Sequence, residues 1–309
     1  MNRDIIERSS PFTKLMFSLF LFVVVFCLSV VVTEGLARLF HMSVLKIDFD
    51  LLEHNATSLT IYKSLQMLQS FLFFAGSSVV IASLMYGNPV KYLAVNEKTL
   101  LLVVLMCILL VVACIPFNNF INELNHAIQL PGSFESTEHT LQRSEKSIDR
   151  IYELFMNTPT IGGLIFNIFL MALIPAIGEE LLFRGVLQQQ IIDVSKNKHT
   201  GIIICSFIFA AIHFQFYTFL PRFILGMMFG YIFLWSRNIW YPVTLHFINN
   251  LMTLLYAWLQ QNRGWGKDLD TIGTIGDRIW MLFISVAVMG VLIWFIHKMT
   301  MKIRSEKIQ

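Results

Sequence analysis

Apolar runs of about eighteen or more residues recur along the whole of this 309-residue chain. Hydrophobic residues make up 56% of the sequence and charged residues only 14%, whereas a soluble domain has about 25% charged residues. A soluble globule is therefore excluded. About 20 apolar residues cross a hydrocarbon layer of roughly 30 Å as a helix, and lipid offers no water to unpaired backbone groups. The sequence predicts an all-α fold, a polytopic membrane helical bundle.

About eight transmembrane helices are expected. An even number places both termini on one side of the membrane, and basic residues at both ends favour the cytoplasm. The predicted outer segments also carry basic residues, such as Lys63, so the loops add nothing to this argument. We expect an integral protein of the cell inner (plasma) membrane with both termini cytoplasmic. The expected spans are 15–39, 65–86, 99–117, 160–178, 201–219, 220–236, 238–260 and 279–297, and the terminal basic residues are Arg3, Arg8, Lys14, Lys298, Lys302, Arg304 and Lys307.

The chain is expected to form a single membrane domain with three parts. Residues 1–157 would supply the first spans and a polar connector, 158–260 a core that carries the polar residues considered below, and 261–309 the final span and a basic tail. The connector contains Pro131 and Gly132. Apolar residues after them recur at helical spacing, which indicates either an amphipathic helix lying on the membrane surface or a solvated linker. Both readings stay open.

Several other classes of protein are disfavoured by the sequence. The four cysteines lie inside apolar runs without a CxxC pair, so neither a disulfide framework nor a cysteine-based zinc site is supported. Net charge is only +3 and the basic residues are scattered, so no nucleic-acid partner is expected. The first apolar run, from Leu15 to Val32, is longer than the apolar part of a secretion signal and is expected to be a retained span.

Two adjacent carboxylates end one of the apolar runs, at Glu179 and Glu180. Ionisable groups within a span cost about 2.5 to 3.5 kcal/mol each, which makes each one a functional hypothesis. Arg184 follows Glu180 by one helical turn, a spacing that favours an ion pair and a structural role for Glu180. Phe183 and Pro175 flank Glu179 instead, so an apolar surround should raise its pKa and suit it as a general base. Alternatively, both acids only mark a membrane boundary.

Two further polar groups lie on other predicted spans. His213 is in the middle of an apolar run, where a histidine is more often a satisfied core residue than a functional one. His246 and Asn250 are one turn apart on one helix face and both can donate hydrogen bonds, although such pairs also serve as polar contacts between membrane helices. Asn249 is close enough in sequence to share that face. Together with the acidic cluster, these residues would suit a water-activating hydrolytic site within a bundle.

The same residues carry a family resemblance. EExxxR (Glu179, Glu180, Arg184), FxxxH (Phe209, His213) and HxxxN (His246, Asn250) occur in order, and the set resembles the CPBP family of CAAX-processing and bacteriocin-immunity membrane proteins, also called Abi or type II CAAX prenyl endopeptidase-like. The resemblance covers about residues 160 to 256. It implies an intramembrane endopeptidase that cleaves near the C-terminus of membrane-associated, CAAX-like substrates. Membrane lipid and such a peptide or protein substrate are the expected partners.

The resemblance also implies roles for the individual residues. Glu179 and His213 would activate water, His246 and Asn250 would donate hydrogen bonds to the oxyanion, and Glu180 and Arg184 would support the site. No cofactor is favoured, because the sequence has no HExxH motif and Asn250 suits an oxyanion hole better than a ligand set. Zinc held by Glu179, His213 and His246 is the alternative.

Two other functions remain as alternatives. A non-catalytic scaffold or bacteriocin-immunity protein of the same family would keep the polar cluster as structure. A proton- or ion-coupled transporter would use buried Glu and His as a relay, but the chain shows no paired halves with broken helices at matching positions.

Overall fold

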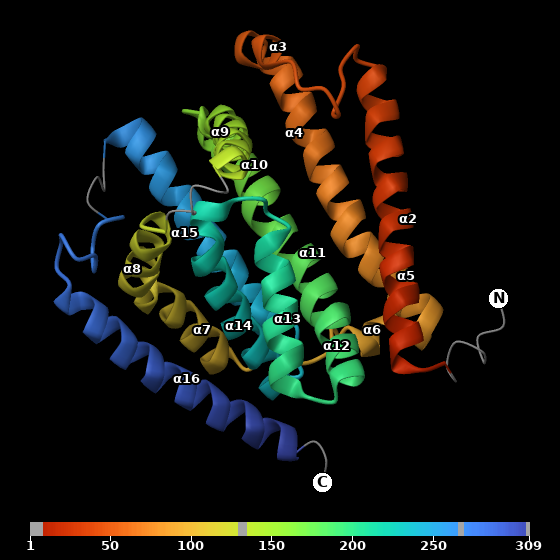
Figure 1. Ribbon diagram of the computed structural model, residues 1–309, viewed down its shortest axis with the longest axis vertical. Helices are drawn as coiled ribbons and strands as arrows, with labels where there is room; N and C mark the ends of the chain where they lie inside the picture. The colour runs from red at the N-terminus through yellow and green to blue at the C-terminus, as the bar shows by residue number, and fades with distance from the viewer. Residues whose placement is uncertain (1–8, 129–134, 265–268, 307–309) are drawn as a thin grey trace. The chain divides into compact units, whose positions relative to one another are not determined.

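The computed structural model of the chain describes residues 9–128, 135–264 and 269–306. This described part is built of helices (Figure 1) and contains no strand, only one isolated β-bridge between Thr274 and Asp277. The all-α prediction is confirmed. Some residues used in the sequence predictions lie outside the described part: Arg3, Arg8, Pro131, Gly132 and Lys307.

The chain forms two compact units, and each is interleaved in sequence. The first unit comprises Met1–Asn96 and Leu154–Gly201, and the second comprises Glu97–Glu153 and Ile202–Gln309. Each unit is described below by itself.

The first unit packs α2, α4 and α5 against the helices that follow residue 160, and Figure 1 shows α2 running beside α4 and α5. Its long helices are interrupted by the π-helical segments η1, η3 and η4, in which backbone hydrogen bonds join residues five apart instead of four. In chain order the elements are α2 (Pro11–Arg38), α3 (Phe49–His54), α4 (Ala56–Phe71), η1 (Leu72–Gly76), α5 (Ser77–Tyr86), α6 (Pro89–Tyr92), α10 (Ile161–Asn167), η3 (Ile168–Leu173), α11 (Ile174–Leu182), η4 (Phe183–Leu187) and α12 (Gln188–Ser195).

The second unit packs its helices around an apolar core. That core joins α7, α14, α15 and α16 through buried side chains such as Leu110, Phe229 and Leu245. The elements are α7 (Leu101–Ala113), α8 (Ile115–His126), α9 (Glu135–Met156), α13 (Lys198–Ala211), η5 (Phe216–Thr218), α14 (Phe219–Ser236), α15 (Trp240–Arg263) and α16 (Trp280–Glu306). The boundary between the units falls within α9 and near the start of α13.

Five helices of the described residues are long and apolar enough to cross a membrane. A sixth span results if the pair α7 and α8, bent by 44°, counts as one. The α13 helix has only 14 residues, short of the roughly 20 that a crossing needs. The count of eight is therefore not confirmed. The five spans are Pro11–Arg38, Ala56–Tyr86, Ile161–Ser195, Phe216–Ser236 and Trp280–Glu306.

Two boundary predictions are corrected by the structure. The run 201–219 is not one helix, because α13 ends at Ala211 and a turn follows it. Lys63 is not in a loop but in α4, where it is buried and its Nζ donates to Phe155 O at 2.7 Å and to Asn167 Oδ1 at 3.2 Å. A lysine that satisfies its donors on neighbouring helices in this way tolerates burial, so it carries no information about the side of the membrane.

The polar connector does form a helix, α9. Leu141, Glu145 and Ile148 recur at helical spacing on its less exposed side, whereas Arg143, Ser144, Lys146 and Ser147 between them are exposed. The structure thus shows a helix in the connector, and its placement on a membrane surface stays a prediction.

Candidate active site

The acidic cluster lies on α11 of the first unit. Pro175 has no N–H for the helix and would clash with the preceding turn, and the wider π-helical η3 directly before α11 accommodates it. Gly178 then allows a close approach, since a Cβ added there would lie 2.9 Å from Phe74 Cβ in η1. This packing against η1 accompanies the burial of the next two residues, Glu179 and Glu180.

The predicted ion pair is present. Arg184 Nη1 donates to Glu180 Oε1 at 2.7 Å, and the two side chains are only 1% and 0% exposed. Burial at this level requires the charges to be paired, because an isolated buried charge is very unfavourable. The structure thus supports a structural role for Glu180, which is held by Arg184.

Glu179 is buried as well, with 8% of its surface exposed. The helix does not end at this residue as the sequence suggested, but continues without a break from Ile161 to Ser195. The apolar residues Leu182, Phe183 and Val186 extend the buried face beyond the glutamates. Glu179 therefore lies near the middle of a 35-residue helix, about 24 Å before its end at 1.5 Å per residue.

His213 lies in the turn after α13, in the second unit. Its Nδ1 is 2.8 Å from the backbone oxygen of Phe209. A carbonyl oxygen only accepts hydrogen bonds, so Nδ1 carries the proton and the lone pair of the neutral ring is on Nε2. That Nε2 could accept a proton from water or bind a metal ion, so this tautomer is compatible with both the metal-free site and the zinc site.

Arg222 is a residue near His213 that the sequence reading passed over. It is half-buried in the first turns of α14, where Nη1 donates to Thr218 Oγ1 at 2.6 Å and Nη2 donates to Gln215 Oε1. It also interacts electrostatically with His213. The cost of an ionisable group in an apolar run, which singled out Glu179, would have flagged Arg222 too.

His246 lies on α15 between two aromatic rings. Its ring centroid is 5.8 Å from that of Phe209 and 5.6 Å from that of Phe229, and the residue is 5% exposed. A Cβ added at Gly226 of α14 would lie 3.2 Å from Ser206 Cβ of α13. The glycine therefore lets these two helices come close enough for Phe209 and Phe229 to enclose the histidine.

The start of α15 is fixed by bonds to the segment before α7. Asn238 Nδ2 donates to Lys98 O at 3.1 Å, and Tyr241 Oη accepts from Leu100 N at 2.9 Å. Asn238 Oδ1 also accepts from Trp240 N at the first turn of the helix. These bonds hold the helix about one turn before His246.

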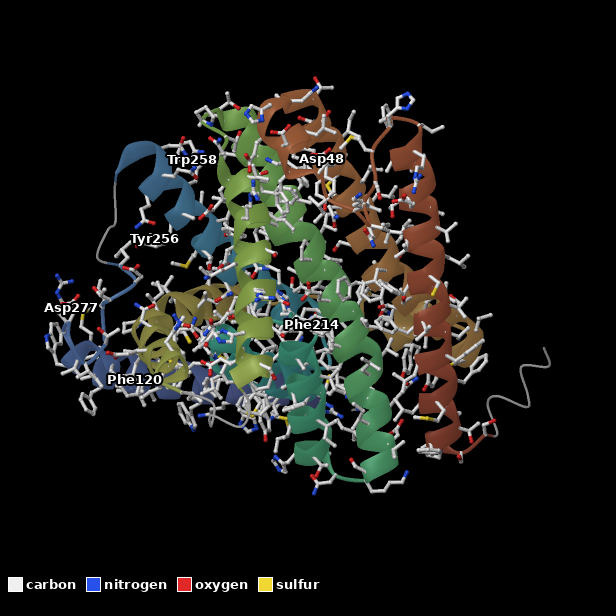
Figure 2. The ribbon with its side chains drawn as sticks, turned by 45° about the horizontal axis from the view of Figure 1, so that its top comes forward. Asp48, Phe120, Phe214, Tyr256, Trp258 and Asp277 are labelled. Atoms are coloured by element: carbon white, nitrogen blue, oxygen red, sulfur yellow. The ribbon has the colours of Figure 1, made fainter. Side chains whose placement is uncertain are left out.

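Asn250 follows His246 by one turn of α15. Its Oδ1 accepts a hydrogen bond from Asn249 Nδ2 at 3.4 Å. In this orientation the Nδ2 donor of Asn250 points away from Asn249. A cavity of about 250 Å³ adjoins this part of α15 and is bounded by Asn249, Met252 and Tyr256 together with residues of α7 and α8; Figure 2 shows Tyr256 on this helix.

The two halves of the candidate site belong to different units. Glu179, Glu180 and Arg184 are in the first, and His213, His246 and Asn250 are in the second. Within the first, the structure brings Glu180 to Arg184; within the second, Phe209 contacts both histidines. Among the described residues no group of three or more His, Cys, Asp or Glu side chains could hold a metal ion. The choice between a metal-free and a zinc site stays a prediction.

Comparison with known proteins finds a family match over the segment that contains these residues. Residues 161–252 match the family model described as Type II CAAX prenyl endopeptidase Rce1-like, and all six predicted site residues lie in that segment. A Bacillus subtilis protein named Uncharacterized protein YpbD is 36% identical over 86 residues, which cover 26% of this chain and 41% of that protein. No solved structure matches.

The helices and the matched segment together define an integral membrane protein with an intramembrane-protease fold. The similarity to the Rce1-like, CPBP family spans residues 161–252 of the chain.

Proposed function

We propose that this protein is an intramembrane endopeptidase that hydrolyses a peptide bond near the C-terminus of membrane-associated substrates, with prenylated CAAX-like ends as the leading candidates. The observation that carries the proposal is the occurrence of all six residues, in order, inside the matched segment 161–252. The buried Glu180–Arg184 pair supports it, because it separates a structural carboxylate from the neighbouring Glu179.

In the proposed reaction, Glu179 and His213 act together as the base that takes one proton from water. The oxygen of that water attacks the scissile carbonyl carbon at the same time. The carbonyl π electrons move to oxygen, and His246 and Asn250 donate hydrogen bonds to that oxyanion; one such donor contributes about 3 to 4 kcal/mol. Collapse of the tetrahedral intermediate breaks the C–N bond, and the proton taken from water passes to the leaving amine. The Nε2 lone pair that the His213–Phe209 bond leaves on the ring suits this transfer.

The direct test is cleavage by purified protein in lipid vesicles. A panel of peptides with free, farnesylated and geranylgeranylated cysteine near the C-terminus would be followed by mass spectrometry, with Glu179→Ala as the inactive control. Release of a short C-terminal peptide by the wild type alone supports the proposal. Absence of any cleavage across the panel favours the second candidate, a non-catalytic scaffold or immunity protein of the same family.

Activity should survive removal of metal. We expect unchanged cleavage after dialysis against a strong chelator and no stoichiometric metal by elemental analysis, because the residues at the site do not form a recognised zinc motif. One zinc ion per chain, lost together with activity in His213→Ala, would instead establish the zinc alternative with Glu179, His213 and His246 as ligands.

Both termini should be cytoplasmic. In a background without the four free cysteines, we expect an impermeant thiol reagent to label Lys196→Cys from the cytoplasmic side and Lys46→Cys from the opposite side. Both positions are exposed; Lys46 follows α2, and Lys196 follows α12 at the end of the span that contains Glu179. The reverse pattern would refute this topology and the cleavage of cytoplasmic substrate ends.

A further inference from the structure

The turn that carries His213 has an unfavourable backbone. Phe214 has a φ of +53°, in the left-handed region that a bulky residue rarely adopts. Its side chain is 72% exposed and lies just past the end of α13 (Figure 2). Such conformations persist only where surrounding contacts hold them. The first half of the turn is held by α13, through His213 Nδ1 and Phe209 O and through Phe214 N and Ala211 O.

The second half of the turn is held by a residue from a distant part of the sequence. Asn125, at the end of α8, is 1% exposed. Its Nδ2 donates to Phe216 O at 2.9 Å, and its Oδ1 accepts from Leu220 N at 2.7 Å. One amide side chain therefore bonds to the first residue of η5, which is a single 3₁₀ turn, and to the first turn of α14 that follows it.

The bond to Leu220 replaces a cap that the local sequence does not provide. Leu220 N lies in the first turn of α14, where backbone N–H groups have no partner within the helix. Thr218, the residue that would normally cap this helix, makes no side-chain cap bond, because its hydroxyl accepts from Arg222 instead. Asn125 thus supplies the acceptor and leaves Thr218 to hold Arg222.

A separate set of contacts holds the Tyr217 side chain. Tyr217 Oη donates to Glu138 and accepts from Gln142 of α9, and its ring stacks on His126 of α8. The backbone N–H of Tyr217 also donates to the carboxyl of Glu145. Burial raises the pKa of this carboxyl and is the largest influence on it, whereas the bond from Tyr217 lowers that pKa. These contacts hold Tyr217 through its side chain and its own N–H. Asn125 instead bonds to the backbone on both sides of Tyr217, at Phe216 and Leu220.

We infer that Asn125 is a positioning residue for His213: by tying Phe216 O and Leu220 N to α8, it locks the left-handed turn at Phe214 and so sets the place and tautomer of the His213 ring. The consequence for catalysis rests on the proposed function. The effect of Asn125 on the position and tautomer of the His213 ring is independent of that function.

The test replaces Asn125 by leucine, which has a similar volume and neither hydrogen-bonding group, in full-length protein in lipid. Asn125→Asp, which keeps the acceptor and loses the donor, is the milder second variant. Leu124→Ala, on the exposed face of the same helix turn, is the matched control. The readouts are the ¹⁵N shifts of the His213 imidazole in histidine-labelled protein, identified by their loss in His213→Gln, and kcat and KM for a peptide that the wild type cleaves.

We expect the wild type and Leu124→Ala to show one tautomer, protonated at Nδ1. Asn125→Leu should show averaged or shifted ring signals and a kcat lower by about 10- to 100-fold with little change in KM, since small displacements of a reacting group have effects of this size. Asn125→Asp should show a smaller change in the same direction.

Unchanged His213 signals in folded Asn125→Leu, or in Asn125→Asp if the leucine variant does not fold, would overturn the inference. If the wild type cleaves nothing, the proposed function fails, but the ring signals still decide whether Asn125 positions His213.

Discussion

Glu179→Gln should abolish peptide cleavage and leave the protein folded. Glutamine keeps the shape of the buried side chain but cannot take a proton from water, and acid–base groups typically contribute about 10²- to 10⁴-fold to a rate. We therefore expect kcat to fall by at least about 100-fold, with the same yield and the same thermal unfolding temperature as the wild type. Mass spectrometry of a cleaved peptide measures the rate.

The matched control is Glu153→Gln, which removes a carboxylate from the exposed face of α9. It should cleave at the wild-type rate. A folded Glu179→Gln protein with wild-type activity would show that the base lies elsewhere.

Arg184→Ala should be the most destabilising single change in the described part of the candidate site. It leaves the carboxylate of Glu180 buried without the guanidinium at 2.7 Å, and breaking a buried pair in this way typically costs about 3 to 5 kcal/mol. We expect a lower yield and a clearly lower unfolding temperature in detergent, together with reduced activity. Glu180→Ala should behave similarly, because it leaves the arginine alone.

Two further variants separate lost pairing from lost volume. The double replacement Glu180→Met with Arg184→Met fills the space with apolar side chains and should be more stable than either single alanine variant, because no buried charge remains. Arg38→Ala removes the same kind of pair, with Glu34 one turn earlier, from an exposed position. It should leave the unfolding temperature unchanged. If Arg184→Ala were equally harmless, the buried pair would have no structural role.

The ion pair could be predicted because it is a local property of one helix. Four residues separate Glu180 from Arg184, and that spacing places the side chains together wherever a helix forms. The prediction of a helical membrane protein followed in the same way from the length of the apolar runs. Neither argument needed knowledge of the neighbouring helices.

The parts that sequence missed depend on contacts between distant residues. Ile202 to Leu220 reads as one apolar run, but Asn125 of α8 bonds to the backbone at Phe216 and Leu220 and stabilises a turn there. Lys63 looked like a loop residue, because its partners, Phe155 and Asn167, lie about a hundred positions away. Such long-range bonds allow polar residues inside a bundle. They also make the ends of the spans hard to predict from the local sequence.

The family match covers residues 161–252, whereas each of the two compact units also includes chain outside that segment. Gly178 packs on Phe74, Gly185 faces Leu93, and the start of α15 is bonded to residues 98 and 100. A fragment cut to residues 161–252 would lose all of these partners and expose apolar surface. Grafting this segment into another membrane protein would therefore require a host that reproduces the contacts of Phe74, Leu93, Lys98 and Leu100. Minimal versions should instead be made by shortening loops and tails.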